Sequence, residues 1–160
     1  MAVKKGDTSS SVAVPHARSS VGAARHAVAD ELAANGVPEP VLQDAVLVVS
    51  ELVSNAIKHA SPLPSGEILV TWNLGDDVLH VEITDGGAMT RPHAGSAAVS
   101  SLGGRGLDIV RTICHSWGVT EDNGTVTVWA DLARTPTSRP SAAASIGQLP
   151  QQPAAADRSR

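Results

Sequence analysis

The sequence is poor in residues that several common functions require. It has no Phe or Tyr and only three Trp, so the core must be aliphatic and the aromatic platforms that bind single-stranded nucleic acids are nearly absent. Cys114 is the single cysteine, which excludes an internal disulfide and a cysteine-based zinc cluster. A lone thiol is compatible with a reducing compartment, so we expect a cytoplasmic protein.

Positive charge and long apolar runs are also scarce. The net charge is −4, which argues against a basic face for nucleic acid and against a polybasic membrane anchor. The first residues contain two lysines but no apolar stretch typical of a signal peptide, and no run of about 18 apolar residues occurs. We therefore expect neither a nucleic-acid partner nor a membrane partner.

Composition divides the chain into three parts. A length of 160 residues suits one domain with an ordinary core. Residues 1–10 are polar and are predicted to be a flexible N-terminus. Residues 135–160 are rich in Pro, Ala, Ser and Gln, and such a segment cannot bury enough surface to offset its ordering entropy. The folded domain is therefore predicted to span residues 11–134, with a disordered C-terminal tail.

The spacing of apolar residues predicts three helices and about five strands. In chain order these are a strand at 10–14, helices at 17–35 and 39–60, strands at 67–74 and 78–84, a helix from about 106, and strands around 119 and at 125–132. A long loop of some 18 residues precedes the third helix. This order favours an α+β two-layer sandwich with a mostly antiparallel sheet.

The second predicted helix carries polar residues on one stripe. Glu51, Asn55 and Lys58 fall within about 60° of one another, opposite the apolar stripe. The stripe is either a solvated polar face or part of a cleft. We assign Leu47 and Val48 to the same face, which favours the cleft. In a cleft a carboxylate can act as a base and an amide oxygen can ligate Mg²⁺.

Two glycine-containing turns follow. Asp85 ends an apolar strand just before Gly86 and Gly87, which is either a plain turn or a place where a carboxylate bonds an adenine amino group. The stretch "GGRGLDIV" at 103–110 is either a flexible joint or a helix N-terminus that binds phosphate. It is neither a Walker A loop nor a dinucleotide-binding fingerprint. For His59 two interpretations remain: it caps the C-terminal end of the second helix, or it belongs to the site.

These stretches resemble the GHKL ATPase superfamily of gyrase, Hsp90, histidine kinases and MutL. "ELVSNAIKHA" resembles its N box, "DGG" its G1 box and "GGRGLDIV" its G2 box, over roughly residues 12–132. The segments "VVSELVSNAIKHA", "GGRGL" and "TVTVW" are most similar in sequence to those of the bacterial anti-sigma-factor serine kinases. The resemblance implies the Bergerat fold, a mixed and mostly antiparallel sheet backed by helices, and often a homodimer.

The resemblance also implies roles for individual residues. Glu51 would be the general base, Asn55 the Mg²⁺ ligand, and Asp85 the partner of the adenine amino group of ATP or ADP. Gly87 would flank the base, while Lys58 and His59 occupy positions that vary in the family. The residues implied at the phosphates are Gly104, Arg105, Gly106 and Leu107, and Thr127 matches the threonine of the last strand motif, with Thr125 as the alternative register.

Two functions are consistent with these residues. The first is a Mg-ATP-dependent protein serine/threonine kinase that phosphorylates a serine of an anti-sigma antagonist and sequesters a sigma factor. The second is a nucleotide-sensing module without turnover, because the predicted lid "AGSAAVSSL" offers few groups to hold a γ-phosphate. A histidine kinase is disfavoured because no long phosphoacceptor helix pair precedes the domain. A purely structural domain is the remaining alternative.

Overall fold

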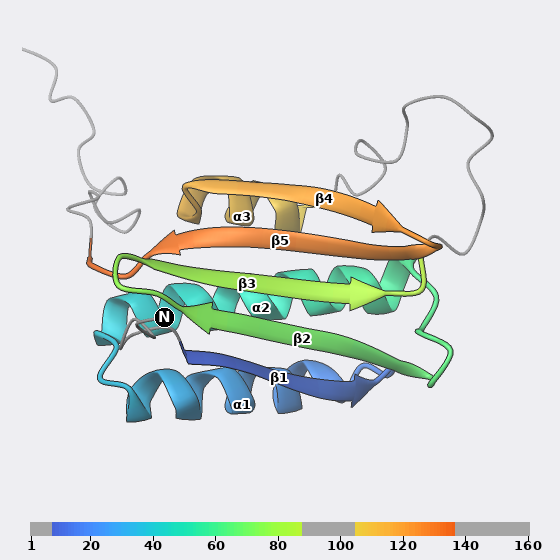
Figure 1. The fold of residues 1–160 in the computed structure, drawn as a ribbon, viewed down its shortest axis with the longest axis horizontal. Helices are drawn as coiled ribbons and strands as arrows, with labels where there is room; N and C mark the ends of the chain where they lie inside the picture. Colours follow the sequence, from blue (N-terminus) through green and yellow to red (C-terminus); the bar gives the residue numbers. More distant parts are fainter. Residues whose placement is uncertain (1–7, 88–104, 137–160) are drawn as a thin grey trace, which may run out of the picture.

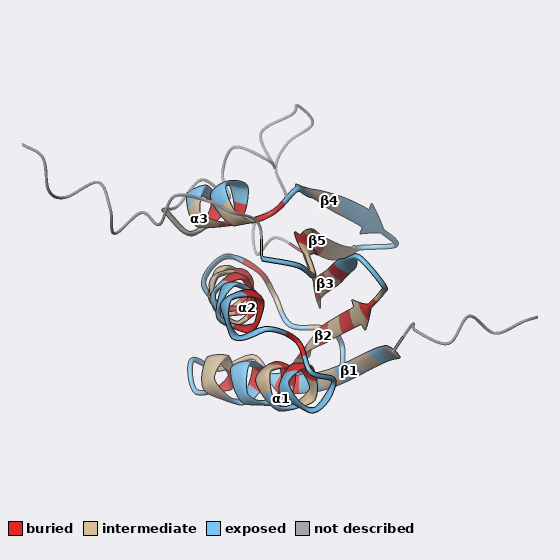
Figure 2. Ribbon diagram, turned by 90° about the vertical axis from the view of Figure 1, so that its left-hand side faces the viewer, coloured by how far each residue is buried: buried red, intermediate tan, exposed pale blue. Residues whose placement is uncertain are grey.

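The computed structural model describes residues 8–87 and 105–136. Within them a sheet of five strands forms one layer, and three helices cover one of its faces (Figures 1 and 2). The elements are β1 (Thr8–Pro15), α1 (Ser20–Ala34), α2 (Glu39–His59), β2 (Glu67–Leu74), β3 (Val78–Asp85), α3 (Arg105–Ile113), β4 (Ser116–Asp122) and β5 (Thr125–Ala133). The predicted α+β sandwich is confirmed.

The sheet has the strand order β1-β2-β3-β5-β4. All four neighbouring pairs in the described residues are antiparallel, so the mixed sheet implied by the resemblance is not seen in this part of the chain. β4 and β5 are joined by a tight turn in which Asn123 and Gly124 have positive φ angles of 48° and 83°. This combination matches the right-handed twist of antiparallel strands.

The inner face of the sheet is largely aliphatic, with Trp72 as a buried aromatic on β2. Along β2 and β3 every second residue is buried, which is the period expected of a sheet with one covered face. The fully buried side chains include Ile68, Val70, Leu79 and Val81, none of them more than 1% exposed. Figure 2 shows buried segments along β2 and β3, on the sheet that the helices cover.

Helix α2 lies at the centre of the helical layer. Pro38 precedes it and Pro40 lies in its first turn, where a missing N–H costs nothing. Its length and composition alone would allow a membrane-spanning helix, but half of the relevant window is buried inside the protein. It packs against both other helices and the sheet. Its buried residues are Val41, Leu42, Ala45, Val48, Val49, Leu52, Val53 and Ala56.

The folded domain begins earlier in the chain than the sequence predicts. β1 begins at Thr8, so the folded domain starts within the segment predicted to be flexible. The structure describes the chain to residue 136, so the predicted tail lies almost wholly outside the described residues, as does most of the predicted long loop. The bounds of α2 and β2 agree with the sequence prediction within one residue.

Among residues 8–87 and 105–136, no helix covers the other face of the sheet, which carries a polar cluster around His80. The imidazole contacts Asp131 Oδ1 at 2.5 Å through Nδ1 and Glu82 Oε1 at 3.0 Å through Nε2. The ring also stacks on Trp129, with centroids 5.9 Å apart. Burial lowers the pKa of His80, but the hydrogen bonds and charges of Asp131 and Glu82 raise it overall.

This cluster predicts a pH-dependent contribution to stability. Because the pKa of His80 is raised on folding, its contribution is complete below about pH 6.5 and is lost as the pH rises through the higher folded value. We expect His80→Gln to remove a pH-dependent part of about 0.5 kcal/mol or less, since the pair is partly exposed and screened. Urea unfolding between about pH 5.5 and 8.5 measures this difference. His59→Gln, an exposed helix position, serves as the control, and an equal pH dependence in both variants would contradict the prediction.

Candidate functional site

Two backbone hydrogen bonds join the end of α2 to the end of β3. The Gly86 N–H donates to Ser61 O and the Ser61 N–H donates to Gly87 O, both at 2.8 Å. Ser61 follows the last turn of α2, and Gly86 follows Asp85, the last residue of β3. The pair of bonds fixes the direction in which both chains leave this end of the fold.

Both glycines are required by space or conformation. A Cβ on Gly86 would lie 2.1 Å from Pro62 O, so no larger residue fits without moving backbone. Gly87 has a φ of 87°, and a Cβ there would lie 3.0 Å from Gly124 O. The left-handed conformation favours glycine. The predicted turn after Asp85 is therefore a close approach between three segments: the end of α2, the end of β3 and the β4–β5 turn.

Asp85 is a buried carboxylate at this junction, with only 4% of its surface exposed. Its Oδ1 accepts a hydrogen bond from the Gly87 N–H at 2.8 Å. Burial raises the pKa of Asp85 above its ordinary value, although the Gly87 hydrogen bond and the charge of His16 each lower it. A buried acceptor of this kind suits a ligand that brings an N–H donor, such as an adenine amino group.

His16 caps α2 and was not singled out from the sequence. Its Nε2 lies 2.8 Å from Ala60 O and 3.3 Å from Ala56 O. These carbonyls belong to the last turn of the helix, where a positive charge is favourable. The sequence left open a cap by His59, but His59 is exposed and the observed contact comes from His16, 44 residues before Ala60.

The polar stripe of α2 is partly covered. Glu51 and Asn55 are half-buried, whereas Lys58 is exposed. The expectation that Leu47 and Val48 share this face was wrong, because Val48 is fully buried in the core while Leu47 is 40% exposed. The helix therefore has a wide buried face that extends to the edge of the stripe, and the covered part of the stripe is Glu51 and Asn55.

Asn55 has an unsatisfied donor. In the described residues, the buried side-chain nitrogens without a hydrogen-bond partner are Asn55 Nδ2 and Trp72 Nε1. Trp72 faces the core from β2, whereas Asn55 lies six residues before Ser61 and its link to Gly86. An unpaired buried donor costs about 1–3 kcal/mol, and such groups require an explanation. A ligand oxygen at this end of α2 would satisfy the amide.

Helix α3 runs antiparallel to α2 (Figure 1). Leu107 and Val110 are 3% and 0% exposed, so the Leu107 side chain belongs to the core. A role for Leu107 at the phosphates is therefore limited to its backbone. Arg105 and Gly106 form the first turn of α3, and Gly104 lies outside the described residues. Because α3 begins toward the C-terminal half of α2, the amides of its first turn lie on the side of Glu51 and Asn55.

Thr127 is not brought together with Asp85. Its Oγ1 lies 2.8 Å from Thr84 Oγ1, on the face of the sheet away from the helices. Side chains alternate between the two faces along β5, and the neighbouring Val128 is buried. The side chain of Thr127 therefore lies on the opposite face. Thr125, the alternative register, lies on the same outer face. The residue paired with Asp85 is Val126, whose side chain also approaches the position of a Gly87 Cβ at 3.7 Å.

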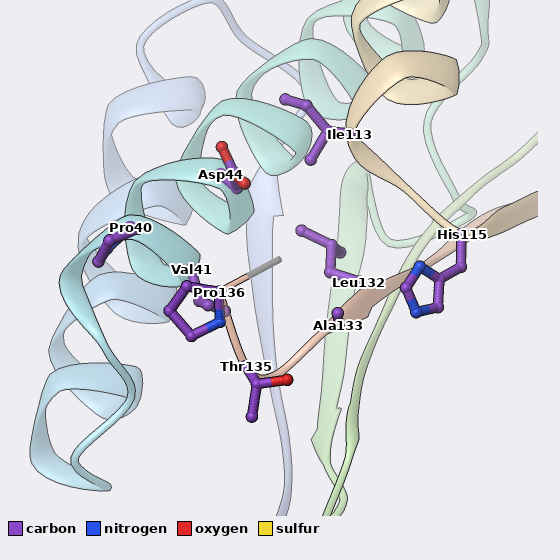
Figure 3. Close-up of a pocket in the computed structure, with 9 residues that line it drawn as sticks. All are labelled: Pro40, Val41, Asp44, Ile113, His115, Leu132, Ala133, Thr135 and Pro136. Carbon is purple, nitrogen blue, oxygen red and sulfur yellow. The ribbon is translucent and has the colours of Figure 1, made fainter. Parts of the chain in front are cut away.

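A separate cavity of about 200 Å³ lies at the opposite end of α2 (Figure 3). Its lining includes Pro40, Val41 and Asp44 from α2, Ile113 from α3, and His115 just beyond that helix. It does not include any residue predicted for the site. The residues that the structure does bring to one end of the fold are Asn55 on α2, Asp85, and the glycines that follow β3.

Comparison with known proteins agrees with this geometry. Residues 14–131 match the histidine kinase-like ATPase domain. The chain belongs to this family. A histidine kinase-like ATPase domain implies ATP binding, and the observed sandwich is consistent with the family's Bergerat fold. A comparison with curated proteins found no match.

Among solved structures, the histidine kinase-like ATPase domain described here is similar to the RsbU and RsbW domains of Rv1364c from Mycobacterium tuberculosis. The TM-score is 0.60 at 18% sequence identity, so the likeness concerns the fold. The match covers 80% of this chain and 33% of the other. The chain therefore spans about a third of the structure that it matches.

The close packing at the junction between α2 and β3 predicts that one added methyl group at Gly86 lowers the stability of the protein. We expect Gly86→Ala to lower the free energy of unfolding by about 1–3 kcal/mol, because its Cβ would collide with the Pro62 carbonyl and strain the α2–β3 link. Chemical denaturation measures the change. The matched control is Gly22→Ala in α1, where a Cβ meets nothing within 4 Å and helix propensity predicts a gain of about 0.5–1 kcal/mol. Equal effects at both positions would refute the steric assignment.

Proposed function

We propose that this protein is a Mg-ATP-dependent serine/threonine kinase of the anti-sigma-factor type. Its substrate would be a serine of an antagonist protein, and its second partner a sigma factor. The observation that carries the proposal is the buried carboxylate of Asp85 at the same end of α2 as the unsatisfied amide of Asn55. The assignment to the anti-sigma-factor type rests on the sequences of the motifs, and the similarity to a protein with an RsbW domain supports it.

The residues around Asp85 fit an adenine. The carboxylate is buried and is held by the Gly87 N–H, which leaves acceptor capacity for an exocyclic amino group. Val126, opposite Asp85 in the sheet, offers an apolar surface to the ring. Gly87 presents no side chain, so a flat base can lie against its backbone. A preference for adenine would follow from the remaining acceptor capacity of Asp85, since a base without an amino group would leave that capacity unused.

Asn55 and α3 fit the phosphate end. The free donor of Asn55 suits a phosphate oxygen, and its amide oxygen is a suitable ligand for Mg²⁺. The N-terminal amides of α3 favour negative charge. When bound, Mg-ATP supplies the phosphoryl group, and its metal ion offsets the negative charge of the phosphates. The backbone at Arg105 and Gly106 would hold the phosphates, as the sequence motif implies.

Glu51 fits the role of general base. It lies four residues before Asn55, one turn along the same face of α2, and is half-buried. In the described residues no ion pair engages it, so its carboxylate is available to a substrate. It would accept the hydroxyl proton of the acceptor serine as the serine oxygen bonds to the γ-phosphorus of ATP and the bond from that phosphorus to the leaving ADP breaks. Lys58, one turn further, is exposed and would face the incoming protein.

A nucleotide-sensing module without turnover is the second candidate. The observation that favours it is the position of two of the described cations: Lys58 is exposed, and Arg111 lies over Trp117, 5.4 Å from the ring centroid. Neither is held against the candidate phosphate site. Such a module would bind ATP and ADP and would change its affinity for a partner without transferring phosphate.

The variant Asp85→Asn distinguishes a role of Asp85 in nucleotide binding from its effect on the stability of the ligand-free protein. The raised pKa of Asp85 means that the folded state holds this proton more tightly, so the free energy of unfolding falls as the pH rises above the ordinary value of 3.8. The neutral amide removes this cost, and we expect a higher melting temperature for the ligand-free variant at neutral pH. In the wild type, Mg-ATP at a hundredfold excess over Kd stabilises by about 2.7 kcal/mol, and Asp85→Asn loses most of this gain.

Differential scanning calorimetry with and without Mg-ATP checks both effects. Asp30→Asn, an exposed position on α1, is the control and keeps the full nucleotide-induced rise. A variant at Asp85 that retains the rise would contradict the adenine assignment. Asn55→Ala should lose the part of the rise that depends on Mg²⁺, which is tested by replacing the metal with EDTA.

Glu51→Gln tests the kinase assignment. Removing a general base lowers the rate of phosphoryl transfer by about 10²–10⁴-fold, while nucleotide binding is retained because Gln keeps the shape. The measurement is transfer of radiolabelled phosphate to an anti-sigma antagonist protein. Glu121→Gln, an exposed residue of β4, is the control. Nucleotide binding by the wild type without any transfer would instead support the sensing module.

A further inference from the structure

The cavity at the N-terminal end of α2 lies on the same helix face as the proposed catalytic residues. Asp44 precedes Glu51 by seven residues and Asn55 by eleven, so the three side chains fall within about 40° of one another around the helix. The rise of an α-helix places Asp44 about 10 Å from Glu51 along the axis. Leu47, 40% exposed, lies between them. A surface therefore continues from the cavity to the proposed base.

The cavity is the wrong size and chemistry for the nucleotide itself. Its volume of about 200 Å³ is below the range of about 300–1,000 Å³ typical of small-molecule sites. None of the residues that line it is Lys or Arg, so apart from the imidazole of His115 its lining offers phosphate no basic side chain. One long side chain of a polypeptide would fit this space.

The residues that line the cavity indicate which kind of side chain it would bind. Val41, Ile113 and Leu132 form apolar walls, while the carboxylate of Asp44 lies opposite Ile113 on the facing helix (Figure 3). Among the described residues no hydrogen bond or ion pair is recorded for Asp44. An apolar wall with one carboxylate at its rim suits the methylene stem and charged head of Arg or Lys.

We propose that this cavity is a docking site for a basic residue of the protein substrate. The inference rests on the kinase function proposed above and names a recognition element for it. A segment in extended conformation advances about 3.3 Å per residue, so a span of about 10 Å corresponds to three or four residues. The substrate therefore carries an Arg or Lys three or four residues from the acceptor serine, on one side only, because the segment crosses the α2–α3 surface in a single direction.

Fluorescein-labelled peptides test the docking site without requiring turnover. Each peptide contains one serine in an Ala- and Gly-rich background, with a single Arg placed one to six residues to either side. Fluorescence anisotropy is measured with the full chain saturated with a non-hydrolysable ATP analogue and Mg²⁺. We expect the tightest binding with Arg three or four residues from the serine on one side, by about fivefold over the other positions, as for a partly exposed ion pair.

Variants of Asp44 decide the assignment. Asp44→Asn should abolish the positional preference, and Asp44→Lys should transfer it to a peptide with Glu in place of Arg. Asp30→Asn is the control and keeps the preference for Arg. Neither Asp44 variant should change the melting-temperature rise caused by the nucleotide analogue. Equal binding of all peptides, no binding of any peptide, or a preference that survives Asp44→Asn would overturn the proposal.

The same peptides distinguish this inference from the proposed function. If the positional preference is present but no phosphate is transferred to any peptide or antagonist protein, the docking site stands and the kinase assignment fails. If phosphate is transferred at rates independent of Arg position and of Asp44, the kinase assignment stands and the docking site is wrong. A lower KM with unchanged kcat for the preferred peptide is the result that supports both.

Discussion

The candidate site depends on the hydrogen-bonded junction between the end of α2 and the end of β3. Two backbone bonds, between Ser61 and the pair Gly86–Gly87, hold the helix against the strand so closely that the Pro62 carbonyl occupies the space of a side chain at Gly86. Because the junction fixes the end of α2, it also fixes the preceding turns. Asn55 is placed in this way relative to Asp85, although 30 residues separate them in the sequence.

The same junction creates an electrostatic conflict. The carbonyls at the C-terminal end of a helix carry partial negative charge, and here a buried carboxylate, Asp85, ends the strand that is linked to that end. His16 relieves the conflict on both sides, since it contacts the Ala60 carbonyl and its charge lowers the pKa of Asp85. The relief is incomplete, because the pKa of Asp85 remains raised. Natural proteins accept such local costs where a group serves a ligand rather than the fold.

The sequence predicted those features that depend on neighbouring residues. The bounds of α2 follow from apolar residues three and four apart between Pro38 and Pro62, and those of β2 from strict alternation. Features that depend on distant partners could not be found in this way. The cap of α2 by His16 joins residues 44 apart, and nothing in the pattern around His16 indicates that contact. The face of Val48 was misjudged because α2 is buried by two helices and a sheet, so its apolar surface is wider than one stripe.

Thr127 lies on the outer face of the sheet, away from the face on which Asp85 is buried. The strand was predicted at its observed place, but side chains of a strand alternate between faces, so a shift of one residue moves a group through the sheet. A motif match identifies the residue type but not the face of the sheet on which its side chain lies. The pairing of Asp85 with Val126 in the structure defines the register of the two strands. The burial of Val128, visible in the apolar alternation of β5, was the signal that could have placed Thr127 on the outer face.

A rigid helix that carries both the proposed base and the proposed docking carboxylate has a consequence for specificity. Loops can adjust the distance between two binding groups, but residues on one α-helix keep a separation set by its rise of about 1.5 Å per residue. Ala45, Val48 and Leu52, which are neighbours of Asp44 and Glu51 on α2, are buried in the core, so the backbone between the two carboxylates cannot bend without opening the core. Recognition of a substrate along this face would therefore depend on the spacing of its residues more than on their surroundings, which is the property expected of sites built on rigid elements.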